Sequence, residues 1–134
     1  MEIWHWMFIV EVILLLLLTF GSYYARRLDM DKHHIMTYTA IIGQVLVFTF
    51  YMRPRILFLI SRGFVSELLI IHAILGLTTI FLSLFLAYMF LKDKNDYDLT
   101  KLRYTRPIMI LTYFMWLATF TFGTIIYFRA HILR

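Results

Sequence analysis

The sequence predicts an all-α protein, an integral membrane four-helix bundle. Of its 134 residues, 62% are hydrophobic and 19% are aromatic, whereas soluble domains are about 45–50% apolar. The apolar residues fall into four runs, each long enough at about 1.5 Å per residue to cross a ~30 Å hydrocarbon core. Because little of the chain remains for a soluble domain, we expect a single membrane domain over residues 1–134.

The limits of the four spans follow from charged residues and prolines. Arg53-Pro54-Arg55 predicts a sharp end to the second span, because proline lacks the donor that a helix needs. Residues 56–60 then predict a short segment along the lipid headgroups. Pro107 predicts the start of the fourth span, where proline is tolerated. The predicted spans are residues 4–24, 34–52, 67–91 and 107–128.

Basic residues predict the orientation of the bundle in a plasma (inner) membrane. One side of the predicted membrane domain carries eight Lys and Arg residues and the other carries five. The richer side is expected to be cytoplasmic, which places both termini on the outer side. The eight are Arg26, Arg27, Lys32, Lys92, Lys94, Lys101, Arg103 and Arg106, and the five are Arg53, Arg55, Arg62, Arg129 and Arg134.

Two features of the composition exclude whole classes of function. The chain has no cysteine, which excludes disulfides, thiolate metal sites and iron–sulfur clusters. Its net charge of +5 comes from short loops between apolar runs. Such loops suit lipid headgroups, and nucleic acid is not an expected partner.

The third span carries one polar stripe. His72, Gly76, Thr79 and Ser83 follow steps of four, three and four, which keep them on one helical face. An ionisable residue inside a span is a functional-site hypothesis by default. The alternative is that His72 only forms a hydrogen bond to a neighbouring helix. In the fourth span, Gly123 shares a face with Thr119, and small residues there predict close helix packing.

Three histidines, His5, His72 and His131, fall on the predicted outer side. Two imidazoles from different helices at one depth can ligate a b-type haem, so all three are candidate metal ligands. Gly76 is the candidate surface on which the macrocycle would lie. For His5 and His131 the simpler interpretation is an interfacial residue with a solvated tip. Arginines on the same side, which can pair with haem propionates, are Arg53, Arg55, Arg62 and Arg129.

Glu11 is a carboxyl group about two turns inside the first span. A charge there costs a few kcal/mol unless it is paired, protonated or next to water. It can therefore transfer protons, for example at a quinol site. The alternative is an ion pair with Arg62 or Arg129 that fixes the order of the helices.

The second span contributes three more candidate polar residues. Gln44 lies on a stripe with His33, Thr37 and Ala40 that is predicted to face inward. His33 and His34 begin the span on the predicted cytoplasmic side. At least one of this pair is expected to be solvated.

From Asp31 to Phe128 the order of features resembles a known family. The residues that carry the resemblance are Lys32-His33-His34-Ile35-Met36, Leu69-Ile70-Ile71-His72-Ala73-Ile74-Leu75, Arg106-Pro107, Phe122-Gly123 and Tyr127. They resemble the CtaM/YozB-like proteins, small four-helix membrane proteins linked to cytochrome c oxidase maturation or function. The family pattern has four histidines, of which His33 (or His34) and His72 match two. Arg53 stands in the place of a third, and residues 101–106 contain no histidine for the fourth.

These observations predict a small membrane subunit or accessory factor of a respiratory, cytochrome oxidase type complex. The lipid bilayer and larger subunits would be its partners, and the chain would not be an enzyme by itself. One alternative is a self-standing b-type cytochrome with His72 as an axial haem ligand, exchanging electrons with quinone. Another is a cofactor-free structural subunit. A visible spectrum of the purified protein separates the cytochrome from the other two.

Overall fold

The computed structural model is all-helical and describes residues 3–92 and 99–131, except for the side chains of residues 99–102, 130 and 131. The all-α class predicted from the sequence is confirmed, as are four helices that could each span a membrane. In the described part of the chain these candidate spans are Ile3–Arg26, Met30–Ser61, Glu67–Lys92 and Arg103–Arg129. The chain divides into two compact units, Met1–Ile70 and Ile71–Arg134.

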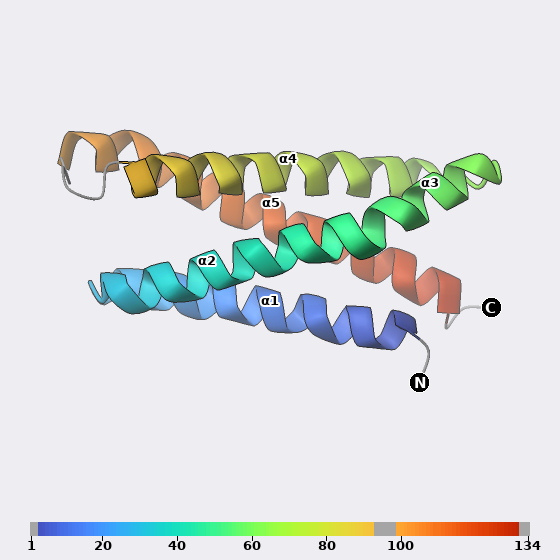
Figure 1. The fold of residues 1–134 in the computed structure, drawn as a ribbon, viewed down its shortest axis with the longest axis horizontal. Helices are drawn as coiled ribbons and strands as arrows, with labels where there is room; N and C mark the ends of the chain where they lie inside the picture. Colours follow the sequence, from blue (N-terminus) through green and yellow to red (C-terminus); the bar gives the residue numbers. More distant parts are fainter. Residues whose placement is uncertain (1–2, 93–98, 132–134) are drawn as a thin grey trace. The chain divides into compact units, whose positions relative to one another are not determined.

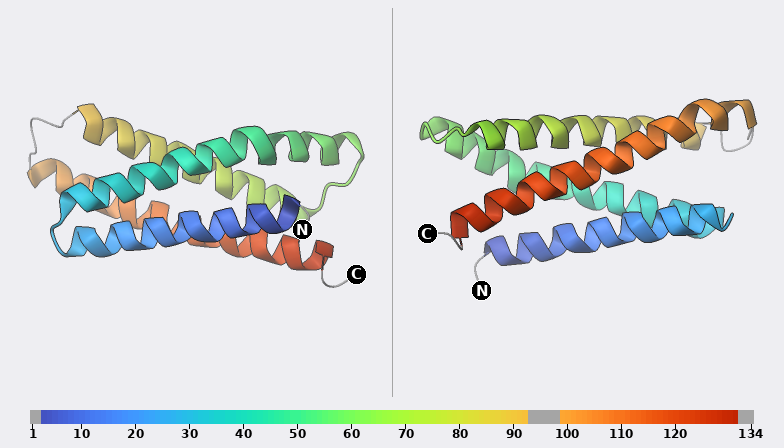
Figure 2. Two further views of the ribbon diagram at one scale, coloured as in Figure 1. Left: turned by 60° about the horizontal axis from the view of Figure 1, so that its bottom comes forward. Right: turned by 180° about the vertical axis from the view of Figure 1, so that it is seen from behind.

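The first unit is built on an antiparallel helix pair, α1 (Ile3–Arg26) and α2 (Met30–Val47), which lie side by side in every view (Figures 1 and 2). Each helix buries one stripe of residues, and Ala40 and Gln44 of the stripe predicted for the second span are buried on α2. Gly43 lets the helices approach closely, because a Cβ there would lie 2.5 Å from a Leu14 methyl carbon. The buried residues of the two helices are Leu14, Leu18, Gly21, Ala40, Ile41 and Gln44.

A tight turn joins α1 to α2. Leu28 adopts the left-handed conformation with φ 61°, and the Asp29 N–H donates to the Tyr24 carbonyl, which together form a Schellman motif. Asp29 then caps α2 by accepting a hydrogen bond from the backbone N–H of Lys32. The hydrogen bonds from the Lys32 side chain and backbone hold the pKa of Asp29 below its usual range. The cap therefore keeps its charge at neutral pH.

The predicted break at Pro54 is wrong. A five-residue π-helical segment, η1 (Phe48–Met52), carries α2 directly into α3 (Arg53–Ser61). The Arg53 N–H donates to the Phe48 carbonyl, five residues back. This wider turn lies where the Pro54 ring would otherwise crowd the carbonyl of Phe50. Residues 56–60 therefore continue the second helix and do not form a separate segment.

The second unit contains α5 (Leu99–His131) and nearly all of α4 (Glu67–Lys92), since the boundary between the units falls near the start of α4. The bounds of α4 differ by a single residue from the predicted span. By contrast, Pro107 lies inside α5, so the prediction that it opens the helix is wrong. The preceding Leu, Lys and Arg residues are good helix formers, and membrane helices tolerate an internal proline.

Polar and small residues line the buried faces of both helices in the second unit. On α4, Thr79 and Ser83 are 3% and 4% exposed, so the stripe predicted from His72 to Ser83 faces inward. On α5, Thr105 and Thr112 are 3% and 6% exposed. Helix pairs in membranes favour such faces, because small side chains let the backbones approach.

We predict that Gly43→Ala destabilises the first unit by about 1–2 kcal/mol, because the added methyl group overpacks against Leu14. Unfolding in mixed detergent micelles measures the effect. In a Leu14→Ala background the same change should cost little, since the clashing methyl carbons are absent. An equal cost in both backgrounds would show that Gly43 has another role.

Candidate functional site

His72 makes a polar contact between α4 and α5. Its Nδ1 atom lies 3.0 Å from the carbonyl oxygen of Thr119. A carbonyl only accepts hydrogen bonds, so Nδ1 carries the proton and donates it. The lone pair of the neutral imidazole is then on Nε2. His72 is thus oriented by the backbone of the facing helix.

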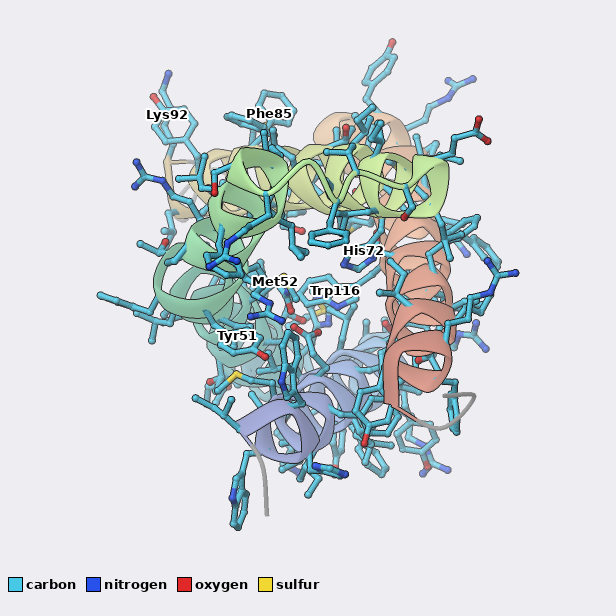
Figure 3. The ribbon with its side chains drawn as sticks, turned by 90° about the vertical axis from the view of Figure 1, so that its right-hand side faces the viewer. Tyr51, Met52, His72, Phe85, Lys92 and Trp116 are labelled. Carbon is cyan, nitrogen blue, oxygen red and sulfur yellow. The ribbon has the colours of Figure 1, made fainter. Side chains whose placement is uncertain are left out.

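Gly123 makes room for this contact. A Cβ at position 123 would lie 2.9 Å from Cε1 of His72, which is closer than carbon atoms pack. The residue lies one helical turn beyond Thr119, so its missing side chain leaves the Thr119 carbonyl open to a second donor. Figure 3 shows His72 pointing from α4 to the side on which α5 lies. His72, Thr119 and Gly123 therefore form one packing unit.

The remaining residues of the His72 stripe are occupied by helix packing. The hydroxyl group of Thr79 donates to the Leu75 carbonyl, and that of Ser83 donates to the Thr79 carbonyl, at 2.7 and 2.8 Å. At Gly76, the proposed surface for a macrocycle, a Cβ would lie 3.3 Å from the methyl carbon of Thr119. The face of Gly76 that would carry the haem is therefore filled by a side chain of α5.

The other candidate ligands of the haem hypothesis lie outside the unit of His72 or outside the described side chains. His5 lies on α1, in the first unit. His131 is the last residue of α5, and its side chain lies outside the described part of the chain. Among the described residues, no three His, Asp or Glu side chains come close enough to hold a metal ion. Arg53 and Arg129 are exposed.

Glu11 and Gln44 form a polar pair between α1 and α2. The Gln44 side-chain amide donates to Oε1 of Glu11 over 3.2 Å. Gln44 is 8% exposed, and its Oε1 has no hydrogen-bond partner among the described residues. In the described part of the chain Glu11 forms no ion pair with Arg62, whose guanidinium lies 5.0 Å from the ring centre of Phe58. Glu11 is thus held by a neutral amide.

His33 resembles His72 in its contact. Its Nδ1 atom donates to the carbonyl oxygen of Gly21 on α1 over 2.8 Å. His34 lies against the ring of Tyr38 in a stacked arrangement, with ring centres 5.6 Å apart. Both histidines are half-buried, so the expectation that one of them is solvated is not supported.

Sequence reasoning missed a cluster at the other end of the first unit. The rings of Trp4 and Tyr51 meet edge to face with centres 5.8 Å apart. The Arg55 guanidinium lies over the Trp4 ring at 4.1 Å. The signal that could have found it is the antiparallel register of α1 and α2, in which the residue numbers of contacting residues have a nearly constant sum. This sum is 55 for Glu11 and Gln44, 57 for Leu14 and Gly43, and 55 for Trp4 and Tyr51.

No protein-family model matches the chain, and no curated protein or solved structure shows significant similarity to it. The functional argument therefore rests on these contacts.

We predict that Gly123→Ala destabilises the second unit by about 1–3 kcal/mol, because the new methyl group pushes His72 from the Thr119 carbonyl. Gly76→Ala should cost less, since its methyl group meets only the tip of the Thr119 side chain. Unfolding in mixed micelles measures both. In a His72→Ala background Gly123→Ala should be nearly neutral; a full cost there would contradict the packing unit described above.

Proposed function

We propose that this chain is a small multi-pass subunit or accessory factor of a respiratory, cytochrome oxidase type complex in the plasma (inner) membrane. The observation that carries the proposal is the Glu11–Gln44 pair, a carboxyl group inside a candidate span that is held by an amide. Polar groups placed there are costly and mark proton relays and binding sites. The resemblance of the sequence to small oxidase-associated membrane proteins supports the choice of complex. In this proposal the four spans form one bundle with both termini outside.

The chemistry of this pair suits the exchange of a proton. When Glu11 is ionised, it accepts the amide hydrogen of Gln44, which is the contact observed. When Glu11 is protonated, it gains an O–H donor, and Oε1 of Gln44 is a buried acceptor with no other donor among the described residues. Gln44 therefore offers a hydrogen bond to both protonation states. A cation in place of Gln44 would favour the ionised state alone.

We predict that Glu11→Gln leaves assembly intact and slows turnover of the complex at least tenfold, since general acid–base groups contribute about 10²-fold or more. Co-purification with the tagged chain measures assembly, and oxygen consumption measures turnover. Glu67→Gln, a change at an exposed carboxylate at the start of α4, is the matched control. Unchanged turnover of the Glu11→Gln complex would leave only a structural role for Glu11. Failure of the wild-type chain to co-purify with oxidase subunits would reject the proposed complex.

A second candidate is a b-type cytochrome that exchanges electrons with quinone through a haem on His72. The hydrogen bond from Nδ1 to a backbone carbonyl favours it, because ligating histidines are commonly held in this way with Nε2 free for the metal. The Thr119 methyl group over Gly76 argues against it. His72 is better explained as a contact that holds α4 to α5, which agrees with a cofactor-free subunit.

We predict that protein purified from haem-replete cells is colourless and keeps its partners. Visible spectra of the oxidised and dithionite-reduced protein test this directly. A sharp band in the b-haem region of the reduced spectrum that disappears in His72→Ala would instead establish the cytochrome. The His131→Ala and His5→Ala variants would then identify the opposite ligand.

A further inference from the structure

One end of the first unit carries a cluster of arginines stacked on aromatic rings, which we call the arginine–aromatic cluster. It consists of Trp4 of α1, Tyr51 of η1, Arg55 and Phe58 of α3, and Arg62, the residue that follows α3. The Arg55 guanidinium lies 4.1 Å from the ring centre of Trp4 and 5.6 Å from that of Phe58. Arg62 lies 5.0 Å from the Phe58 ring. Tyr51 marks this end of the unit in Figure 3.

The charge at this end is not balanced. From Arg53 to Glu67 the sequence has three arginines and a single carboxylate, that of Glu67. In the part of the chain that the structure describes, none of these arginines forms an ion pair with a carboxylate. At the opposite end of the same unit, Lys32 pairs with Asp29 at 3.0 Å. The cluster therefore has a surplus of positive charge that an external anion can neutralise.

The geometry leaves the arginines free to bind an anion. Stacking occupies the face of a guanidinium and leaves the N–H groups at its edge available. Their fork matches the oxygen atoms of a phosphate or a carboxylate. Each stack also holds a long side chain in place, which lowers the entropy lost on binding.

The position of the cluster along the helix selects a phospholipid among possible anions. The continuous helix Met30–Ser61 has 32 residues, or about 48 Å, which exceeds the ~30 Å hydrocarbon core. The end of this helix that carries the arginines then lies at headgroup depth, where Trp and Tyr are enriched. Phe58, which lies between Arg55 and Arg62 on their face of the helix, is an exposed apolar side chain, 46% exposed. A ligand with both a phosphate and acyl chains suits this combination.

We propose that the arginine–aromatic cluster binds the headgroup phosphate of an anionic phospholipid. Arg55 and Arg62 contact the phosphate, while Phe58, which lies between them on the same face of the helix, contacts the acyl chains. This inference does not rest on the proposed respiratory function. It concerns a part of the molecule distant along α1 and α2 from the His33 contact with Gly21.

Lipid titration of the full-length protein tests the proposal. Phosphatidylglycerol or phosphatidylcholine is added to the detergent-purified protein, and bound lipid is counted by native mass spectrometry. Wild type should prefer phosphatidylglycerol. The double variant Arg55→Gln/Arg62→Gln should lose affinity for it about 30-fold, since each basic residue near an anionic lipid contributes roughly fivefold. High salt should weaken the wild-type binding, because it screens the charges.

Arg27→Gln is the matched control. Its guanidinium lies 4.8 Å from the ring centre of Tyr23, but it belongs to the turn that contains Asp29, so this variant should bind as wild type does. Helical circular dichroism and elution volume verify that all variants fold. Equal wild-type binding of the two lipids, equal loss in Arg27→Gln, or displacement of the lipid by millimolar inorganic phosphate or by an acidic peptide would each overturn the proposal. If Arg55→Lys/Arg62→Lys still binds the lipid but with reduced affinity, the result would support binding by guanidinium groups that stack on aromatic rings.

Discussion

The structure depends on the constraint that a polar group in hydrocarbon must find its partner within the protein. Hydroxyl groups meet this constraint locally. Thr39, Thr78 and Thr124 each donate to the carbonyl four residues back at 2.7 to 2.8 Å. Imidazoles and amides are too far from their own backbone for this, so they cross to a neighbouring helix. Two buried oxygens, those of Gln44 and Tyr51, have no hydrogen-bond partner in the described part of the chain.

Each unit uses the same contact to hold its helices together. An imidazole N–H donates to a backbone carbonyl of the facing helix, from His33 to Gly21 in one unit and from His72 to Thr119 in the other. A carbonyl that already accepts within its helix has a second lone pair, so neither helix loses a bond. In the second unit, Gly123 leaves the space that the His72 ring fills. The geometry explains why intramembrane histidines need not imply a metal.

The sequence located the four long helices, but it did not give all of their ends or the contacts between them. A continuous apolar run defines α4 to within a residue, and spacing alone identified the inward stripe from His72 to Ser83. The predictions at Pro54 and Pro107 failed because a helix can widen or give up one hydrogen bond and continue. The contact of His72 with Thr119 depends on how far α5 slides along α4. Packing along the full length of α4 and α5 decides that offset, so it cannot be predicted from the spacing of residues in either helix.

The π turn at Phe48–Met52 has a consequence for how the long second helix can vary. It fits one residue more into a turn than an α-helix does, which offsets the angular phase of everything beyond it by about 100°. The side chains of α3 therefore point in directions that are rotated relative to the stripe of α2 that packs on α1. A gain or loss of one residue here would leave the α1–α2 pair in place, but it would turn Arg55 away from the Trp4 ring of α1.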